Sequence, residues 1–141
     1  MDFTKNPFDA ATIGLVLQAE KNNNGAAFTV RSKPTGKDFT FKINRSEFNG
    51  KFYTHVKVEQ GYMNFTYLCS YYNGMITKKR QPVKTPAALA IAWVLKMIES
   101  QKFSLLKEQV EFMHLGNCLR CGRVLTDADS IQIGLGPVCR S

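Results

Sequence analysis

Three cysteines near the C-terminus constrain the fold of this chain more than any other feature of its sequence. Cys118 and Cys121 form a C-x2-C pair followed directly by Gly122, and 17 residues separate Cys121 from Cys139. Structural zinc takes four nitrogen or sulfur ligands in a tetrahedron, and a C-x2-C turn supplies two of them. His114 lies just upstream of the pair. The spacing therefore predicts one structural zinc ion, held by His114, Cys118, Cys121 and Cys139.

Other interpretations of the cysteines make different demands on the sequence. A thioredoxin-like redox pair opens a helix, whereas Gly122-Arg123 and a short apolar segment follow this pair. A catalytic zinc site needs a general base, and no glutamate follows Glu111. Unligated structural cysteines remain a third possibility. Only two residues follow Cys139, so the fourth ligand is expected upstream, with His55 and Cys69 as alternatives to His114.

The middle of the chain carries the alternation of apolar and polar residues that is typical of half-buried strands. Asn73-Gly74 is a strong hairpin signal, and Gly-containing or Pro-containing turns separate the other segments. We expect an antiparallel meander of four or five strands between residues 26 and 78. The expected strands are residues 27–31, 39–43, 52–59, 64–72 and 75–77.

Two helices are expected on either side of this meander. Residues 9–20 show a helical apolar period with Asp9 as a cap, and Thr85-Pro86 opens an apolar helix that extends to about residue 100. Residues 102–112 are ambiguous between a helical turn and an extended segment. The predicted fold class is α+β: an antiparallel sheet packed against two helices, with a C-terminal zinc-ribbon or knuckle-like module. The expected units are a basic α+β domain, 1–112, and a zinc-binding module, 113–141, packed on it.

The charge of the chain is basic and unevenly distributed. The net charge is +8, and residues 1–85 carry 13 basic against 6 acidic side chains. A surface with this excess attracts nucleic acid, anionic proteins or anionic lipid, although a well-solvated small domain can carry a similar charge.

The aromatic residues of the basic region have two interpretations. Single-strand binders place exposed aromatics beside cationic groups, whereas alternating aromatics on one face simply form a core. Phe39 with Phe41, and Phe65 with Tyr67, fit the core. Exposed positions are expected for three tyrosines, Tyr53, Tyr71 and Tyr72. The candidate contacts for nucleic acid or a partner protein are Lys33, Lys37, Lys57, Tyr71, Tyr72, Lys78, Lys79 and Arg80.

The C-terminal segment resembles a known family. The pattern is C-x2-C-G-R-x-L-T-D-x2-S-I-x2-G-x-G-P-x-C, from Cys118 to Cys139. It is similar to a zinc-ribbon-like module of unknown function that is common in bacteriophage proteins, and in some members a His precedes the first Cys by four residues, as His114 does. A looser similarity extends over residues 26–72. The resemblance implies a metal site, a phage or mobile-element origin and, from its usual context, nucleic-acid handling.

These observations favour a non-enzymatic, zinc-stabilised basic protein that engages nucleic acid in the cytoplasm of a bacterial host. The alternative is a phage inhibitor that binds a host protein, for example to block a nucleic-acid-processing complex. A phosphate-binding Gly-Lys-Ser/Thr loop and a Gly-x-Ser-x-Gly elbow are both missing, so no enzyme and no small-molecule substrate are expected. The longest apolar run, residues 87–95, is too short to span a membrane, and the N-terminus lacks the pattern of an export signal.

Overall fold

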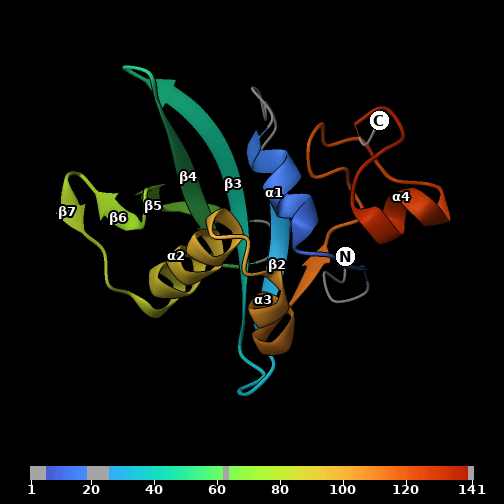
Figure 1. Cartoon of the computed structure of the whole chain (residues 1–141), viewed down its shortest axis with the longest axis horizontal. Helices are drawn as coiled ribbons and strands as arrows, with labels where there is room; N and C mark the ends of the chain where they lie inside the picture. Colours follow the sequence, from blue (N-terminus) through green and yellow to red (C-terminus); the bar gives the residue numbers. More distant parts are fainter. Residues whose placement is uncertain (1–5, 19–25, 62–63, 140–141) are drawn as a thin grey trace.

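A long antiparallel sheet organises the molecule (Figure 1). The computed structural model describes residues 6–18, 26–61 and 64–139. Within them the sheet has eight strands in the order β1-β8-β2-β3-β4-β5-β6-β7. The strands are β1 (Pro7–Phe8), β2 (Ala26–Ser32), β3 (Asp38–Phe48), β4 (Lys51–Glu59), β5 (Phe65–Tyr72), β6 (Met75–Lys78), β7 (Gln81–Pro82) and β8 (Val110–His114).

The meander from β2 to β6 confirms the strands expected from alternation, with β3 longer than its pattern suggested. Three described strands lie outside the expected meander, namely the short β1 and β7 and the longer β8. Of these, β8 lies between β1 and β2. Its residues pair with β2, for example Phe112 with Val30 and His114 with Phe28. This long-range pairing makes the end of the ambiguous segment, residues 102–112, part of the second strand from the β1 edge of the sheet.

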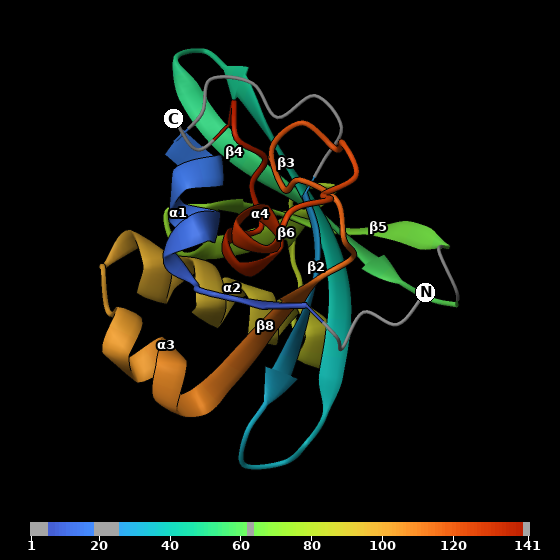
Figure 2. The same ribbon diagram turned by 90° about the vertical axis from the view of Figure 1, so that its right-hand side faces the viewer.

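Helices cover one face of the sheet. They are α1 (Ala11–Gln18), α2 (Pro86–Glu99) and α3 (Phe103–Gln109). All three lie on the same side of β2 and β3 in Figure 2, and their buried residues join those of the strands in one core. The α+β class is thus confirmed, with more strands and helices than the sequence indicated.

The two expected helices begin at the expected caps. The Asp9 carboxylate accepts a hydrogen bond from the Ala11 amide at 2.9 Å. The Thr85 hydroxyl accepts one from the Ala88 amide at 3.3 Å, and Pro86 follows at the first helical position. Residues 19 and 20 of the first predicted helix lie outside the described residues. In α2 the buried side chains are Ala88, Ile91, Val94, Leu95, Met97 and Ile98, which pack across the sheet.

A β-bulge decides which side chains of β5 face the core. Val56 pairs with Cys69, but its neighbour Lys57 pairs with Tyr67, so Leu68 is an extra residue in β5. Cys69 and Tyr71 point into the core, while Phe65 and Tyr67 lie on the opposite face of the sheet. The expectation that Phe65 and Tyr67 belong to the core is therefore wrong, because one inserted residue reverses the alternation.

We call this opposite face of β3, β4 and β5 the outer face. In each strand the side chains of this face point away from the core, on the side opposite the buried residues. They include Lys42, Tyr53, Lys57, Phe65, Tyr67 and Tyr72. Among the described helices none lies on this side of the sheet (Figures 1 and 2).

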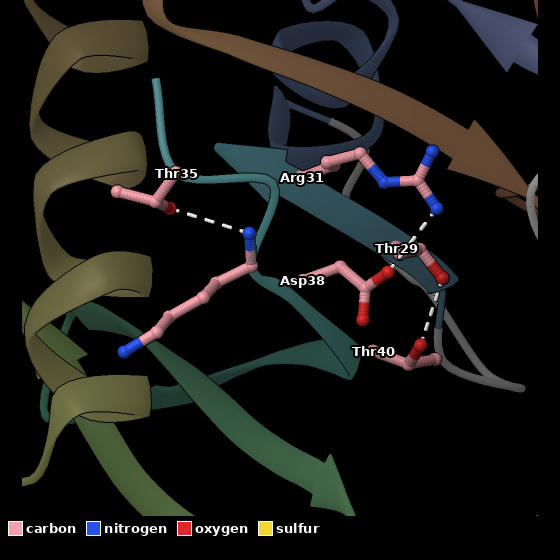
Figure 3. A network of polar contacts seen from close by, with 6 residues as sticks. Thr29, Arg31, Thr35, Asp38 and Thr40 are labelled. Carbon is pink, nitrogen blue, oxygen red and sulfur yellow. Dashed lines mark hydrogen bonds and ion pairs between the residues drawn. The ribbon is translucent and has the colours of Figure 1, made fainter. Parts of the chain in front are cut away.

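Polar contacts close the β2–β3 hairpin at the end of the sheet near the turn (Figure 3). The Arg31 guanidinium forms an ion pair with Asp38 at 3.2 Å. Thr29 and Thr40 join their hydroxyls at 2.7 Å, and the Thr35 hydroxyl accepts a hydrogen bond from the Lys37 amide at 3.2 Å. The positive charge of Arg31 is therefore matched locally.

The segment after β8 packs against the edge of the sheet and contains one short helix, α4 (Ala128–Ile133). Leu115, Leu119, Leu125 and Leu135 are buried, and three of them belong to the main core. The expected domain boundary between residues 112 and 113 falls inside β8, and the division into two units stays a prediction. None of the helices in the described ranges is long and apolar enough to cross a membrane.

Candidate metal centre

Three thiols converge in the C-terminal segment. The Sγ atoms of Cys118, Cys121 and Cys139 all lie within 4.8 Å of one another. Cys118 is buried, and the other two are half-buried. Such a cluster of soft donors suits zinc and other thiophilic metals. The three cysteines predicted from spacing are thus brought together.

The C-x2-C turn is built by the backbone around Cys118. The Cys118 carbonyl accepts a hydrogen bond from the Gly122 amide at 2.9 Å, and the Cys118 amide donates to the Arg123 carbonyl at 2.7 Å. Gly122 has a φ of 83°, which a residue with a side chain rarely adopts. The glycine after the pair therefore allows the tight turn that aligns the two sulfurs.

Cys139 reaches this turn through α4 and the loop that follows it. Asp127 caps α4 by accepting the Ser130 amide at 3.0 Å, and Gly134 ends the helix with a φ of 86°. The Leu119 amide donates to the Gly134 carbonyl at 2.9 Å, which ties the loop to the C-x2-C turn. An aspartate cap and a terminal glycine are therefore the sequence signals that could have predicted α4.

Backbone amides prepare the sulfur of Cys118 to carry negative charge. Its Sγ accepts hydrogen bonds from the amides of Gly136 at 3.4 Å and Cys121 at 3.5 Å. Burial alone would raise the pKa of the Cys118 thiol, but these amides and that of Arg120 lower this pKa to about 7. Amides aimed at a sulfur are what a thiolate ligand requires.

The neighbouring sulfurs have the opposite effect on Cys139. Three causes raise the pKa of the Cys139 thiol to about 12. The largest is burial, followed by its hydrogen bonds with Cys121 and Cys118 and by the negative charge of these two sulfurs. Three thiolates cannot share so small a space without a cation. A bound divalent metal removes this conflict, because a coordinated thiol is deprotonated by the charge of the metal.

The fourth predicted ligand, His114, is not part of the thiol cluster found among the described residues. Its ring is fully buried and lies 5.8 Å from the ring of Phe8, centroid to centroid. Nε2 donates to the Ile131 carbonyl at 2.6 Å, and Nδ1 accepts from the Gly116 amide at 2.9 Å. Both ring nitrogens are therefore used in joining β8 to α4 and to the loop.

The environment of His114 keeps its ring neutral. Burial lowers the pKa of His114, and the hydrogen bond to the Ile131 carbonyl offsets only part of that effect. The two alternatives for the fourth ligand also lie elsewhere. His55 bonds to Ser46 and Ser70 on the outer face, and Cys69 is fully buried in the core, where burial raises the pKa of its thiol to about 11.

The residues predicted to contact nucleic acid or a partner fall in four places. Lys57 and Tyr72 lie on the outer face. Lys33 and Lys37 lie in the β2–β3 turn. Lys78 ends β6, and Lys79 and Arg80 form the turn to β7.

Tyr71, by contrast, is buried, with 4% of its surface exposed, and its hydroxyl donates to Glu99. The prediction that Tyr71 is an exposed contact is wrong, because Tyr71 pairs with the buried Thr54 and shares the core face of β5 with Cys69.

Comparison with known proteins gives one match. A family model described as a family of unknown function (DUF6011) matches residues 109–141. No curated protein and no solved structure matches the chain. The matched segment covers β8 from its first residue and the whole thiol cluster, in agreement with the sequence resemblance to a family of unknown function.

Proposed function

We propose that this chain is a non-enzymatic, zinc-stabilised protein of phage or mobile-element origin that binds nucleic acid in the host cytoplasm. The observation that carries the metal part is the cluster of three thiols, with amides directed at one of them. The nucleic-acid part is supported by the basic excess of residues 1–85, the region that builds most of the sheet.

The role proposed for the metal is structural. Cys118, Cys121 and Cys139 would each supply a thiolate and so link the C-x2-C turn to the loop after α4. Zinc supplies the positive charge that lets three thiolates lie together and fixes their relative positions. Arg120 already joins the same two segments by donating to the Cys139 carbonyl at 3.3 Å.

His114 remains the proposed fourth ligand, in competition with its hydrogen bonds to Ile131 and Gly116. If it binds zinc, His114→Ala lowers the zinc content more than His55→Ala or Cys69→Ala does. If its work is to join β8 to α4, His114→Ala lowers stability while the folded fraction keeps its zinc. Zinc per folded chain, measured after size-exclusion chromatography, separates these roles.

The nucleic-acid part predicts electrostatic binding with little sequence selectivity. Affinity for an oligonucleotide should fall steeply as salt rises, because each neutralised phosphate releases counterions. Titration of labelled oligonucleotides at several salt concentrations tests this. Absence of binding at low salt would contradict the proposal and favour the alternative, an inhibitor that docks on a host protein.

A further inference from the structure

The outer face of the sheet combines aromatic rings with positive charge. Tyr53 of β4 and Tyr72 of β5 stack with their ring centroids 5.0 Å apart and their planes at 35°. The Lys51 ammonium lies 5.6 Å from the centre of the Tyr72 ring, and the Lys42 ammonium lies 5.9 Å from that of Phe65. Phe65 and Tyr72 on this face thus each have a cation beside the ring.

The bulge in β5 is what assembles this surface. Without the extra residue Leu68, the alternation of β5 would place Phe65 and Tyr67 on the same face as the core residues Cys69 and Tyr71. With it, Phe65 and Tyr67 join Tyr72 on the outer face. Tyr67 is 41% exposed there. The β-bulge thus turns two aromatic side chains towards the face that the described helices leave uncovered.

Polar groups connect the three strands across the centre of the face. The Ser46 hydroxyl lies 2.5 Å from Nε2 of His55, and Nδ1 of His55 lies 3.1 Å from the Ser70 hydroxyl. The Ser70 hydroxyl is in turn 2.5 Å from that of Tyr67. Burial lowers the pKa of His55, so the ring is neutral at pH 7. This row of hydroxyls and imidazole holds the side chains in place and leaves hydrogen-bonding groups at the surface.

The charge of the face selects an anionic occupant. It carries Lys42, Lys51 and Lys57 with two carboxylates, Glu59 and Asp38, of which Asp38 forms an ion pair with Arg31 of β2. Lys42 and Lys57 lie directly opposite each other on neighbouring strands, a repulsive arrangement unless an anion lies between or above them. The centres of protein–protein interfaces are depleted of lysine. This composition therefore fits the phosphodiester backbone of a nucleic acid better than a protein partner.

We propose that the outer face of β3, β4 and β5 binds single-stranded nucleic acid, with bases stacked on Tyr53 and Tyr72 and phosphates beside Lys42, Lys51 and Lys57. This inference rests on the proposed function and assigns it a surface. Tyr53 and Tyr72 are half-buried. Aromatic rings that keep part of their surface open to solvent can stack on unpaired bases, whereas a duplex keeps its bases stacked inside. Single strands are therefore preferred to duplex of the same length.

The test uses the full zinc-loaded chain and about 20-nucleotide labelled oligo-dT, oligo-U and a DNA duplex, followed by fluorescence anisotropy. Tyr53→Ala with Tyr72→Ala should weaken single-strand binding about tenfold or more, while Tyr53→Phe with Tyr72→Phe keeps the rings and most of the affinity. Lys42→Gln, Lys51→Gln and Lys57→Gln together should lower the slope of log affinity against log salt by about 2. This second variant remains informative if the alanine variant fails to fold.

A variant of equal net charge is the matched control. Lys96→Gln, Lys102→Gln and Lys107→Gln remove three exposed charges from α2 and α3, on the side of the sheet opposite the outer face, and should leave the slope nearly unchanged. If both triple variants lose binding equally, or if the duplex binds more tightly than single strands, the outer face is not the site, although nucleic-acid binding itself stands. If the wild-type chain binds none of the three probes at low salt, the proposed function fails and the assigned surface fails with it.

Discussion

The sheet with its three helices and the C-terminal segment after His114 are stabilised in different ways. The first buries large apolar side chains, with Phe28, Phe41 and Ile91 all fully inaccessible to solvent. The second buries a few leucines and otherwise depends on backbone hydrogen bonds, tight turns and three clustered thiols. The comparison indicates that one region folds by apolar burial, while the other needs a cross-link that a metal can supply.

The largest expected effect comes from removing a ring from the shared core. Phe28 contacts Phe8, Phe41 and Phe112, with ring centroids 6.2 to 6.4 Å away. Phe28→Ala should lower the free energy of unfolding by about 3–5 kcal/mol, because it deletes a fully buried ring between three strands. Urea denaturation followed by circular dichroism measures this loss. If the sheet loses less than about 1 kcal/mol, apolar burial is not what holds the first region.

The next effect should be confined to the second region. Cys121→Ser removes one thiolate, so we expect zinc to be lost and residues 115–139 to become accessible to protease and to amide exchange, while the sheet amides stay protected. Hydrogen exchange read by mass spectrometry distinguishes the two regions. The control is Cys69→Ala, which removes a thiol from the sheet core and should leave the zinc content unchanged.

Loss of protection throughout the chain in Cys121→Ser would instead show that the two regions fold as one unit. Two kinds of contact connect the regions. Leu119, Leu125 and Leu135 join the main core. Thr12 of α1 also donates a hydrogen bond to the Ile133 carbonyl at 2.8 Å.

A smaller effect is expected from the turn that brings Cys139 back to the pair. Gly134 has a φ of 86°, and a β-carbon there would lie 3.1 Å from Cδ1 of Leu119. Gly134→Ala should therefore cost about 1–2 kcal/mol. It should also lower zinc affinity, since the loop after α4 carries Cys139. Gly36→Ala is the matched control: its φ of 74° adds the same backbone strain, but open space surrounds the β-carbon. Equal zinc affinity in the two variants would contradict this role of the turn.

The smallest effect concerns pH and the outer face. Burial lowers the pKa of His55 below its ordinary value of 6.5, so the unfolded chain takes up this proton more readily than the folded one. Stability should fall as the pH drops below about 6.5 until it reaches the folded pKa, and His55→Gln should reduce that fall slightly. Urea midpoints at pH 7 and pH 5.5 compare the two proteins. The same dependence in both would show that His55 does not contribute.

Much of the first region could be predicted from the sequence, because its strands and helices follow simple periods and caps. Thr85-Pro86 and Asn73-Gly74 are local signals, and each marks the expected boundary. Long-range pairing is not local, so nothing in the sequence placed β8 between β1 and β2. The bulge at Leu68 also escapes a strict period of two, which gives Tyr67 and Tyr71 the same face and so places Tyr67 in the core. The expectation of an exposed Tyr71 has no support from that period.

The metal centre was predictable in part, since cysteine spacing identifies Cys118, Cys121 and Cys139 without knowledge of the fold. The spacing of residues could not decide whether His114 binds the metal or joins β8 to α4. Its spacing from Cys118 suits a ligand, but its ring is also buried by Phe8 and bonded to Ile131, and both contacts depend on tertiary structure.

Zinc stoichiometry tests the central claim most directly. The full chain, purified without chelator, should contain about one equivalent of zinc by atomic emission, held by the thiolates of Cys118, Cys121 and Cys139. Removal of that zinc should expose residues 115–139 to protease and leave the sheet intact. Less than about half an equivalent of zinc, with the C-terminal segment equally protected before and after chelation, would contradict a metal-stabilised second region.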